Sequence, residues 1–337
     1  MLISMTFVRL FLFLISALWA DLGFSGHEDH YDEYQAAEVQ PFYSSGYFDQ
    51  LKLRDGKSLA YSVFENKVSD RAIVVMQGRT ESMLKYAEWI YDLHRLGFTV
   101  FAFDFRGQGN SDHLVPHRPS YGHIDDFDTY VEDLREFLDK VVAPRHKGKL
   151  FLYAHSMGGA VAVMHELKYP SRFLGTVLQS PMLDIKTAPI PQFLARWLVR
   201  LMVFMGYGES LPPMQKEADV HEKNTVTTST IRREYSLAQR MKNSSAYIGP
   251  PTNLCVERAF AATEDFRSAA KKLTNSIFMF QAGDDRFVVN ETLDHFCRNA
   301  KDCKSIMMSG GMHELYLERD QVRDEVLKKT SDYFNRF

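Results

Sequence analysis

Residues 152–159, Leu-Tyr-Ala-His-Ser-Met-Gly-Gly, constrain the fold of this chain more than any other stretch. The apolar run 149–153 has the length and composition of a buried β-strand. Ser156 follows it at once, and small residues then open a helical pattern at 158–162. A strand, a sharp turn that carries a serine, and a helix form a nucleophile elbow, which raises the serine Oγ above the edge of a sheet. Ala154 stands where this motif usually has glycine, and alanine is small enough to fit.

Strand and helix patterns alternate along most of the chain. A hairpin around Asp55-Gly56 joins the stretches 46–53 and 58–64. Further strands are predicted at 72–76, 99–103, 149–153, 174–179, 276–281 and 305–308, and helices at 86–96, 126–142, 161–169 and 321–337. This order predicts an α/β fold, a mostly parallel sheet covered by helices on both faces. The core would comprise residues 41–180 and 271–337.

Residues 181–270 break the alternation, because they contain several helical stretches and no clear strand. We interpret them as a helical cap inserted above the carboxyl ends of the strands, where ligands bind in open α/β sheets. The stretch 192–205 is apolar nearly all round, so it is buried or meets lipid. Phe193, Trp197 and Leu201 are candidate contacts for an acyl chain, with simple packing of cap on core as the alternative.

The N-terminus differs from the rest of the chain. Residues 1–20 combine Arg9 with the short apolar run 10–19, which predicts a signal peptide or an N-terminal anchor. We therefore expect an exported, periplasmic or membrane-associated protein; the alternative is the cytoplasmic face of the inner membrane. Residues 21–40 are interpreted as a solvated linker, although His27 and His30 lie among carboxylates that could bind a metal.

Charge and cysteine content narrow the functional classes. The formal net charge is −3 with Lys and Arg dispersed, so nucleic acid is not an expected partner. The three cysteines leave two alternatives open: a disulfide between Cys297 and Cys303 with Cys255 reduced, or three buried thiols.

Two later segments supply the partners that a nucleophilic serine needs. Serine requires a base to take its proton, and the base requires a carboxylate to hold its tautomer; on an elbow fold they follow in the order serine, acid, histidine. The strand 276–281 leads into Asp284 and Asp285, which are the acid candidates. The strand 305–308 leads into a Gly-rich loop that carries His313, the candidate base. His155 adjoins the serine but is expected to pack rather than react.

The tetrahedral intermediate of acyl transfer requires two donors for its oxyanion. The backbone N–H of Met157, at the start of the helix beyond Ser156, is one candidate. The second is the N–H of Arg79, in the loop after the strand 72–76, where Gly78 makes room. The guanidinium of Arg79 could separately hold a phosphate. This chemistry requires no metal and no cofactor.

Four motifs resemble those of a known family: Asp-Phe-Arg-Gly-Gln-Gly-Asn-Ser at 104–111, Ala-His-Ser-Met-Gly-Gly at 154–159, Gly-Asp-Asp-Arg-Phe-Val at 283–288 and Gly-Met-His at 311–313. Together they resemble the α/β-hydrolase group of monoacylglycerol lipases and bacterial inner-membrane lysophospholipases, which is similar to the serine aminopeptidases. The segments 78–82, 85–88, 127–134 and 249–252 strengthen the likeness to the lysophospholipases. The resemblance implies Ser156 as nucleophile, His313 as base and Asp285, rather than Asp284, as acid.

These observations favour a serine hydrolase that cleaves carboxylic esters of single-acyl lipids, lysophospholipid or monoacylglycerol, with contact to a membrane surface. An esterase of small substrates or an aminopeptidase would use the same triad; Glu209, Glu217 or Glu222 could then bind a free amine. A non-catalytic lipid-binding protein on the same scaffold is the alternative from another class.

Overall fold

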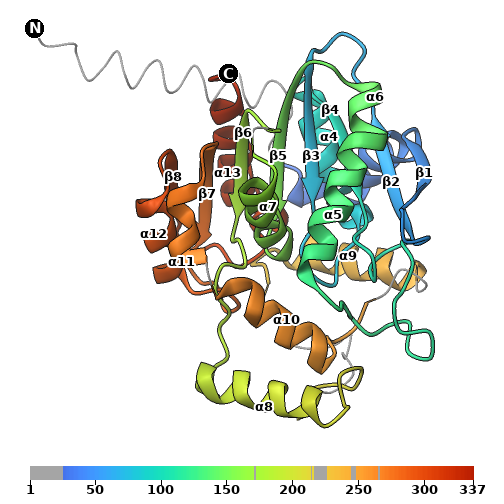
Figure 1. Ribbon diagram of the computed structural model, residues 1–337. Coiled ribbons are helices and arrows are strands. Elements are labelled where there is room, and N and C mark those ends of the chain that lie inside the picture. Colours follow the sequence, from blue (N-terminus) through green and yellow to red (C-terminus); the bar gives the residue numbers. More distant parts are fainter. Residues whose placement is uncertain (1–25, 171, 214, 216–225, 244–247, 265) are drawn as a thin grey trace, which may run out of the picture.

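The computed structural model describes residues 26–337, apart from 171, 214, 216–225, 244–247 and 265. Its strands form one eight-stranded sheet in the order β1-β2-β4-β3-β5-β6-β7-β8 (Figure 1). Only the pairs β1–β2 and β2–β4 are antiparallel. The strands are β1 (Tyr47–Lys52), β2 (Ser58–Phe64), β3 (Arg71–Met76), β4 (Thr99–Phe103), β5 (Lys149–His155), β6 (Gly175–Gln179), β7 (Ser276–Ala282) and β8 (Cys303–Met308).

Helices cover both faces of this sheet, which confirms the predicted α/β-hydrolase fold. Helices α5 (Phe127–Phe137), α7 (Met157–Lys168) and α12 (Asn290–Asn299) pack on one face, and α4 (Ala87–Arg95) and α13 (Asp320–Phe334) on the other (Figure 1). Alternate residues of β3 enter the two cores: Val74 joins the first and Val75 the second. This is why the central strands are apolar without a break. Short helices η3 (Met83–Tyr86), η4 (Leu138–Val142) and α6 (Ala143–Arg145) extend α4 and α5.

The interpretation of residues 21–40 as a solvated linker is wrong for the part that the structure describes. Residues 28–44 form the helical pieces η1 (Glu28–His30), α2 (Tyr31–Tyr34), η2 (Gln35–Val39) and α3 (Gln40–Ser44). The side chains of Tyr31, Tyr34 and Val39 are buried in the core that includes α4. Acidic residues between them hide the amphipathic spacing in the sequence. The predicted leader 1–20 lies outside the described residues.

The described residues between β6 and β7, in the region interpreted as the cap, include four helices. They are α8 (Gln192–Phe204), α9 (Thr230–Lys242), α10 (Asn253–Thr263) and α11 (Phe266–Ala269), and the turn η6 (Ala270–Lys272) leads back to the sheet. Figure 1 shows α8 and α10 beyond the end of the sheet at which β6 finishes, with α8 outermost. Within the described part of the chain, no helix is both long and apolar enough to cross a membrane.

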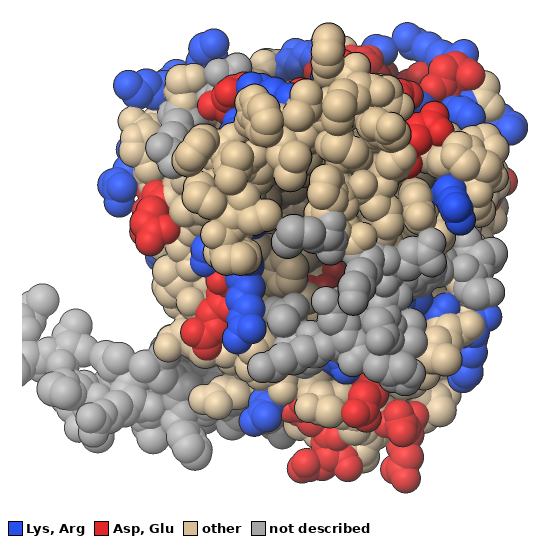
Figure 2. All heavy atoms as spheres, turned by 90° about the horizontal axis from the view of Figure 1, so that it is seen from below, with Lys and Arg blue, Asp and Glu red and all other residues tan. Residues whose placement is uncertain are grey.

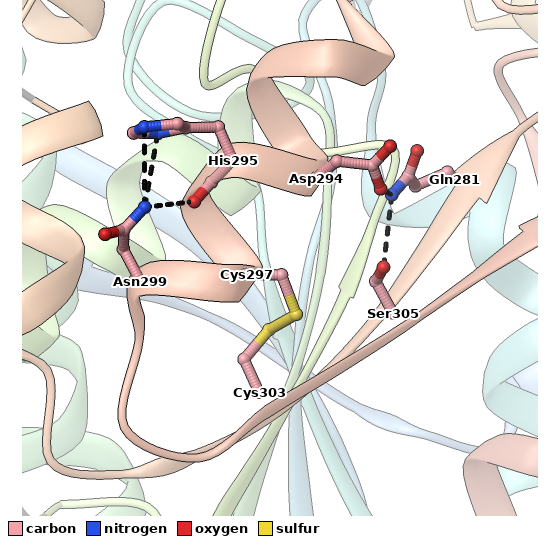
Figure 3. The surroundings of a disulfide bond; sticks show 7 residues. All are labelled: Gln281, Asp294, His295, Cys297, Asn299, Cys303 and Ser305. Carbon is pink, nitrogen blue, oxygen red and sulfur yellow. Dashed lines mark hydrogen bonds between the residues drawn. A yellow bond between two sulfur atoms is a disulfide. The ribbon is translucent and has the colours of Figure 1, made fainter.

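Of the two alternatives for the cysteines, the structure has the disulfide. Cys297 near the end of α12 and Cys303 at the start of β8 are bonded, with their Cα atoms 5.2 Å apart (Figure 3). Cys255 is buried and reduced. The bridge therefore closes the short turn between α12 and β8, the two elements that follow the candidate acid and precede the candidate base.

Candidate active site

Ser156 lies in the sharp turn between β5 and α7, with φ 49° and ψ −116°. Residues other than glycine rarely adopt a positive φ, and backbone strain of this kind is often found at functional sites. The small residues around it are sterically required. A Cβ on Gly158 would lie 2.6 Å from the carbonyl oxygen of Gln77, and one on Gly159 would lie 2.6 Å from the Pro181 Cβ.

The structure brings Ser156, His313 and Asp285 together in one hydrogen-bonded chain. His313 Nε2 lies 2.9 Å from Ser156 Oγ, and His313 Nδ1 lies 2.8 Å from Asp285 Oδ2. Ser156 follows β5, Asp285 follows β7 and His313 follows β8, so three parallel strands deliver the three groups to one edge of the sheet. The geometry is that of a nucleophile, its base and the carboxylate that orients the base.

The surroundings of Asp285 distinguish it from Asp284. Burial would raise the pKa of the Asp285 carboxyl, but the hydrogen bond and charge of His313, with the N–H groups of Phe287 and Val288, outweigh it and hold the pKa below its usual value. Asp285 is thus kept ionised against the imidazole. The side chain of Asp284 is exposed.

The loop after β3 lies close to Ser156 and contains a backbone N–H without an acceptor in the described part of the chain. Gly78 N–H donates to Glu81 Oε2 at 2.6 Å, and Thr80 N–H donates to Gln108 Oε1 at 2.7 Å. Between them, the N–H of Arg79 has no hydrogen-bond acceptor within the described part of the chain, and neither has that of Met157. A Cβ on Gly78 would lie 3.2 Å from the Ser156 Cβ, so this loop approaches Ser156 closely.

Two residues that sequence reasoning missed brace this loop. The Gln108 amide also donates to the Gly78 carbonyl at 3.0 Å, so it holds the loop from both sides of Arg79. The carboxylate of Glu81 accepts from Gly78, Tyr86, Lys85 and Tyr316. Gln108 and Glu81 lie in segments quoted above for the family resemblance, which was the only signal for them.

Two buried carboxylates, those of Glu81 and Glu314, lie next to the residues described above. Lys85 Nζ contacts Glu81 Oε1 at 2.9 Å and Glu314 Oε1 at 2.6 Å. Burial, followed by the charge of Glu81, raises the pKa of Glu314 to about 7, although Lys85 opposes the shift. Burial also opposes ionisation of Glu81, but Lys85 and the donors around it outweigh burial and lower the pKa of Glu81.

His155 packs in this region, as the sequence analysis expected. It is buried, and its ring centroid lies 4.8 Å from that of His313. Burial lowers the pKa of His155 to about 3, so its ring is neutral at pH 7 and places no positive charge beside His313.

Phe193 and Trp197, the candidate contacts for an acyl chain, are exposed and do not pack between the cap and the core, so their contact with an acyl chain stays a prediction. Their exposed fractions are 76% and 59%, because α8 packs against α10 and buries only Val199, which leaves the opposite stripe outward. Leu201 is partly buried. The periodicity indicated an apolar helix but could not indicate which side faces the protein.

The chain is similar to several known proteins. The family model described as serine aminopeptidase, S33, matches residues 67–320. Lysophospholipase L2 of Escherichia coli is 31% identical over 289 residues, covering 81% of this chain and 83% of the relative. The mouse monoglyceride lipase is 30% identical over 287 residues, covering 83% and 87%. A solved monoglyceride lipase from Saccharomyces cerevisiae shares the fold, with a TM-score of 0.69, 16% identity and coverage of 86% and 94%.

Proposed function

Because this chain belongs to the serine aminopeptidase S33 family of α/β-hydrolases, we propose that it cleaves carboxylic esters of single-acyl lipids, lysophospholipids or monoacylglycerols, through an acyl-enzyme. The observation that carries the proposal is the continuous hydrogen-bonded chain from Ser156 through His313 to Asp285. The names of the relatives support the lipid substrate, since they include lysophospholipases and monoglyceride lipases.

In the proposed mechanism, His313 Nε2 removes the proton of Ser156 as Oγ attacks the acyl carbonyl. Asp285 stabilises the imidazolium that forms. The N–H groups of Met157 and Arg79 donate to the oxyanion of the tetrahedral intermediate. His313 then protonates the departing alcohol, and the acyl-enzyme is hydrolysed by a water that His313 activates in the same way.

A fluorophosphonate probe tests the nucleophile without any assumption about the substrate. It should label the wild-type protein and fail to label Ser156→Ala. Ser309→Ala, an exposed serine of the loop that carries His313, is the matched control and should label normally. An unreactive wild-type protein would favour the non-catalytic lipid-binding alternative.

Substrate comparison tests the lipid assignment. We expect lysophospholipids and monoacylglycerols to be hydrolysed with higher kcat/KM than short nitrophenyl esters or aminoacyl amides. Preference for the amides would favour the aminopeptidase alternative. Of the acids considered for an amine site, Glu209 is exposed, and its Oε2 lies 3.7 Å from Nε2 of the exposed His117. The other two acids, Glu217 and Glu222, lie outside the described residues.

The outer stripe of α8 supports the proposal that the enzyme acts at a lipid surface. Phe193, Trp197 and Phe204 are 76%, 59% and 89% exposed. Figure 2, viewed from the side on which α8 is outermost, shows a broad area without charged side chains whose margin carries Lys, Arg, Asp and Glu. Such an apolar face with a charged rim is typical of interfacial binding.

Vesicle co-sedimentation tests this contact. The double variant Phe193→Ser/Trp197→Ser should bind phosphatidylglycerol vesicles at least about tenfold more weakly, because each exposed aromatic loses its transfer free energy into lipid. Val68→Ser is the control, since Val68 is 96% exposed at the opposite end of the sheet. Equal binding of all three proteins would contradict the proposal.

We also propose that the chain is exported. The apolar run 10–19 and the disulfide between Cys297 and Cys303 support this, because disulfides persist in oxidising compartments. Fusion of residues 1–40 to a reporter that is active only outside the cytoplasm tests the proposal, and an inactive reporter would contradict it.

A further inference from the structure

The side chain of Arg79 is a cation without a counter-ion of its own. Its guanidinium makes no hydrogen bond or ion pair within the described part of the chain, and the residue is exposed. Protein nevertheless surrounds the group closely enough that burial lowers the pKa of the guanidinium. An anion binds favourably to an accessible cation that has lost part of its hydration, because it replaces the lost interactions with water.

The groups around Arg79 do not neutralise it. The strongest electrostatic influences on its guanidinium after burial come from Cys255 of α10 and Tyr130 of α5. Both are neutral near pH 7, because burial raises the pKa of Cys255 to about 11 and that of Tyr130 well above its usual value. The carboxylate of Glu81 acts on Arg79 more weakly and already accepts from four donors.

The position of Arg79 in the chain places this cation beside the reacting ester. Its backbone N–H is the proposed oxyanion donor, and Gly78 before it would place a Cβ 3.2 Å from the Ser156 Cβ. Gln108 and Glu81 fix the loop on both sides, so the guanidinium projects from a rigid anchor. Any group that the Arg79 guanidinium binds must therefore lie no farther from the acyl carbonyl than about the length of an arginine side chain.

We propose that the Arg79 guanidinium binds the phosphate of the substrate head group, and that it directs the enzyme toward lysophospholipids in preference to monoacylglycerols. This inference rests on the proposed lipid esterase activity. In a lysophospholipid, the three carbons of glycerol separate the acyl ester from the phosphate, which suits one residue that contacts the oxyanion through its backbone and the phosphate through its side chain. A planar guanidinium can bind phosphate with two parallel hydrogen bonds.

Substrate discrimination by Arg79 variants tests the proposal. The measured quantity is the selectivity ratio, which is kcat/KM for a lysophospholipid divided by kcat/KM for the monoacylglycerol with the same acyl chain. We expect Arg79→Gln to lower this ratio by about 10- to 100-fold, the range for a lost charge-assisted hydrogen bond. Arg79→Lys keeps the charge and should retain part of the ratio. Arg54→Gln, a surface arginine, is the control and should keep the wild-type ratio. Equal losses on both substrates would overturn the proposal.

A second measurement does not depend on lipid hydrolysis. Glycerol 3-phosphate should inhibit hydrolysis of a short nitrophenyl ester by the wild-type enzyme, and Arg79→Gln should raise its inhibition constant about tenfold or more. Inorganic phosphate, used in parallel, distinguishes recognition of the head group from binding of any phosphate. Inhibition that is unchanged in Arg79→Gln would overturn the proposal. A wild-type enzyme that is inhibited through Arg79 but cleaves no lipid would contradict the proposed substrate and leave the phosphate site standing.

Discussion

Glu81 and Glu314 bind the same cation from two sides: Lys85 Nζ lies 2.9 Å from one carboxylate and 2.6 Å from the other. Glu81 also accepts from the Gly78 N–H in the proposed oxyanion loop, and Glu314 directly follows His313. One partly buried ammonium thus connects the loop that would bind the oxyanion with the loop that carries the candidate base.

Glu81→Gln should lower kcat about tenfold or more with a smaller effect on KM. An amide oxygen can accept from two of the four donors at most, so the set of bonds that fixes Gly78 is broken and the Arg79 N–H beside it is held less firmly. Loss of an oxyanion donor outright costs about 10²–10³ in kcat. Steady-state kinetics on a nitrophenyl ester measure the change. Glu132→Gln, a partly exposed carboxylate of α5, is the control. Unchanged kcat in Glu81→Gln would show that the loop holds its geometry without this carboxylate.

Glu314 makes the stability of the protein depend on pH. Its pKa is raised from 4.5 to about 7, so between these values the unfolded state has released a proton that the folded state retains. The contribution of Glu314 to the free energy of unfolding therefore falls as pH rises through this window and is constant above it. Glu314→Gln removes this contribution. The free energy of unfolding of Glu314→Gln, relative to that of the wild type, should therefore increase from pH 4.5 to 7, as measured by urea unfolding. If the difference between the two free energies does not change with pH, the prediction is contradicted.

Asp285→Asn should reduce kcat by about 10³–10⁴-fold, because an amide does not hold His313 in the required tautomer. Asp284→Asn is the matched control and should have a mild effect, since that side chain is exposed and outside the hydrogen-bonded chain. Both variants should fold with similar Tm. Equal losses of activity, or the reverse order, would overturn the assignment of the acid.

Gly158→Ala should destabilise the protein by about 1–3 kcal/mol, the usual effect of overpacking, and impair activity. The new methyl group would lie 2.6 Å from the backbone oxygen of Gln77, so the elbow and the strand end must separate. Gly208→Ala is the control, because its nearest contact would be an ordinary 3.7 Å to Leu254. Thermal unfolding of the two variants measures the difference, and equal Tm values would contradict the steric argument.

Replacing Cys297 and Cys303 together by serine should lower the free energy of unfolding by about 2 kcal/mol, the value expected when so short a loop is no longer closed. Urea unfolding with and without dithiothreitol measures it. The reductant should destabilise the wild type and leave the double variant unaffected. A wild type that is insensitive to reductant under unfolding conditions would contradict the presence of the bridge.

The sequence by itself determined the parts of the site that depend on local geometry. A strand followed by Ser156 and small residues predicted a tight elbow, and in the structure neighbouring atoms leave no space for a Cβ at Gly158 or Gly159. Strand ends likewise located His313 and the Asp284–Asp285 pair, and the alternation of strands and helices predicted the sheet. These inferences succeeded because each depends on residues that are neighbours in the chain.

Only the tertiary structure decided which faces are covered and which charges meet. The stripe of Phe193 and Trp197 points outward because α8 has α10 on its other side, and residues 28–44 are helical because the core with α4 buries their tyrosines. Lys85 meets Glu314 across 229 positions of sequence. Periodicity indicates that one face of a helix is apolar, and composition indicates that charged residues are present. Which face is buried and which charged side chains pair depends on long-range packing, which no local pattern encodes.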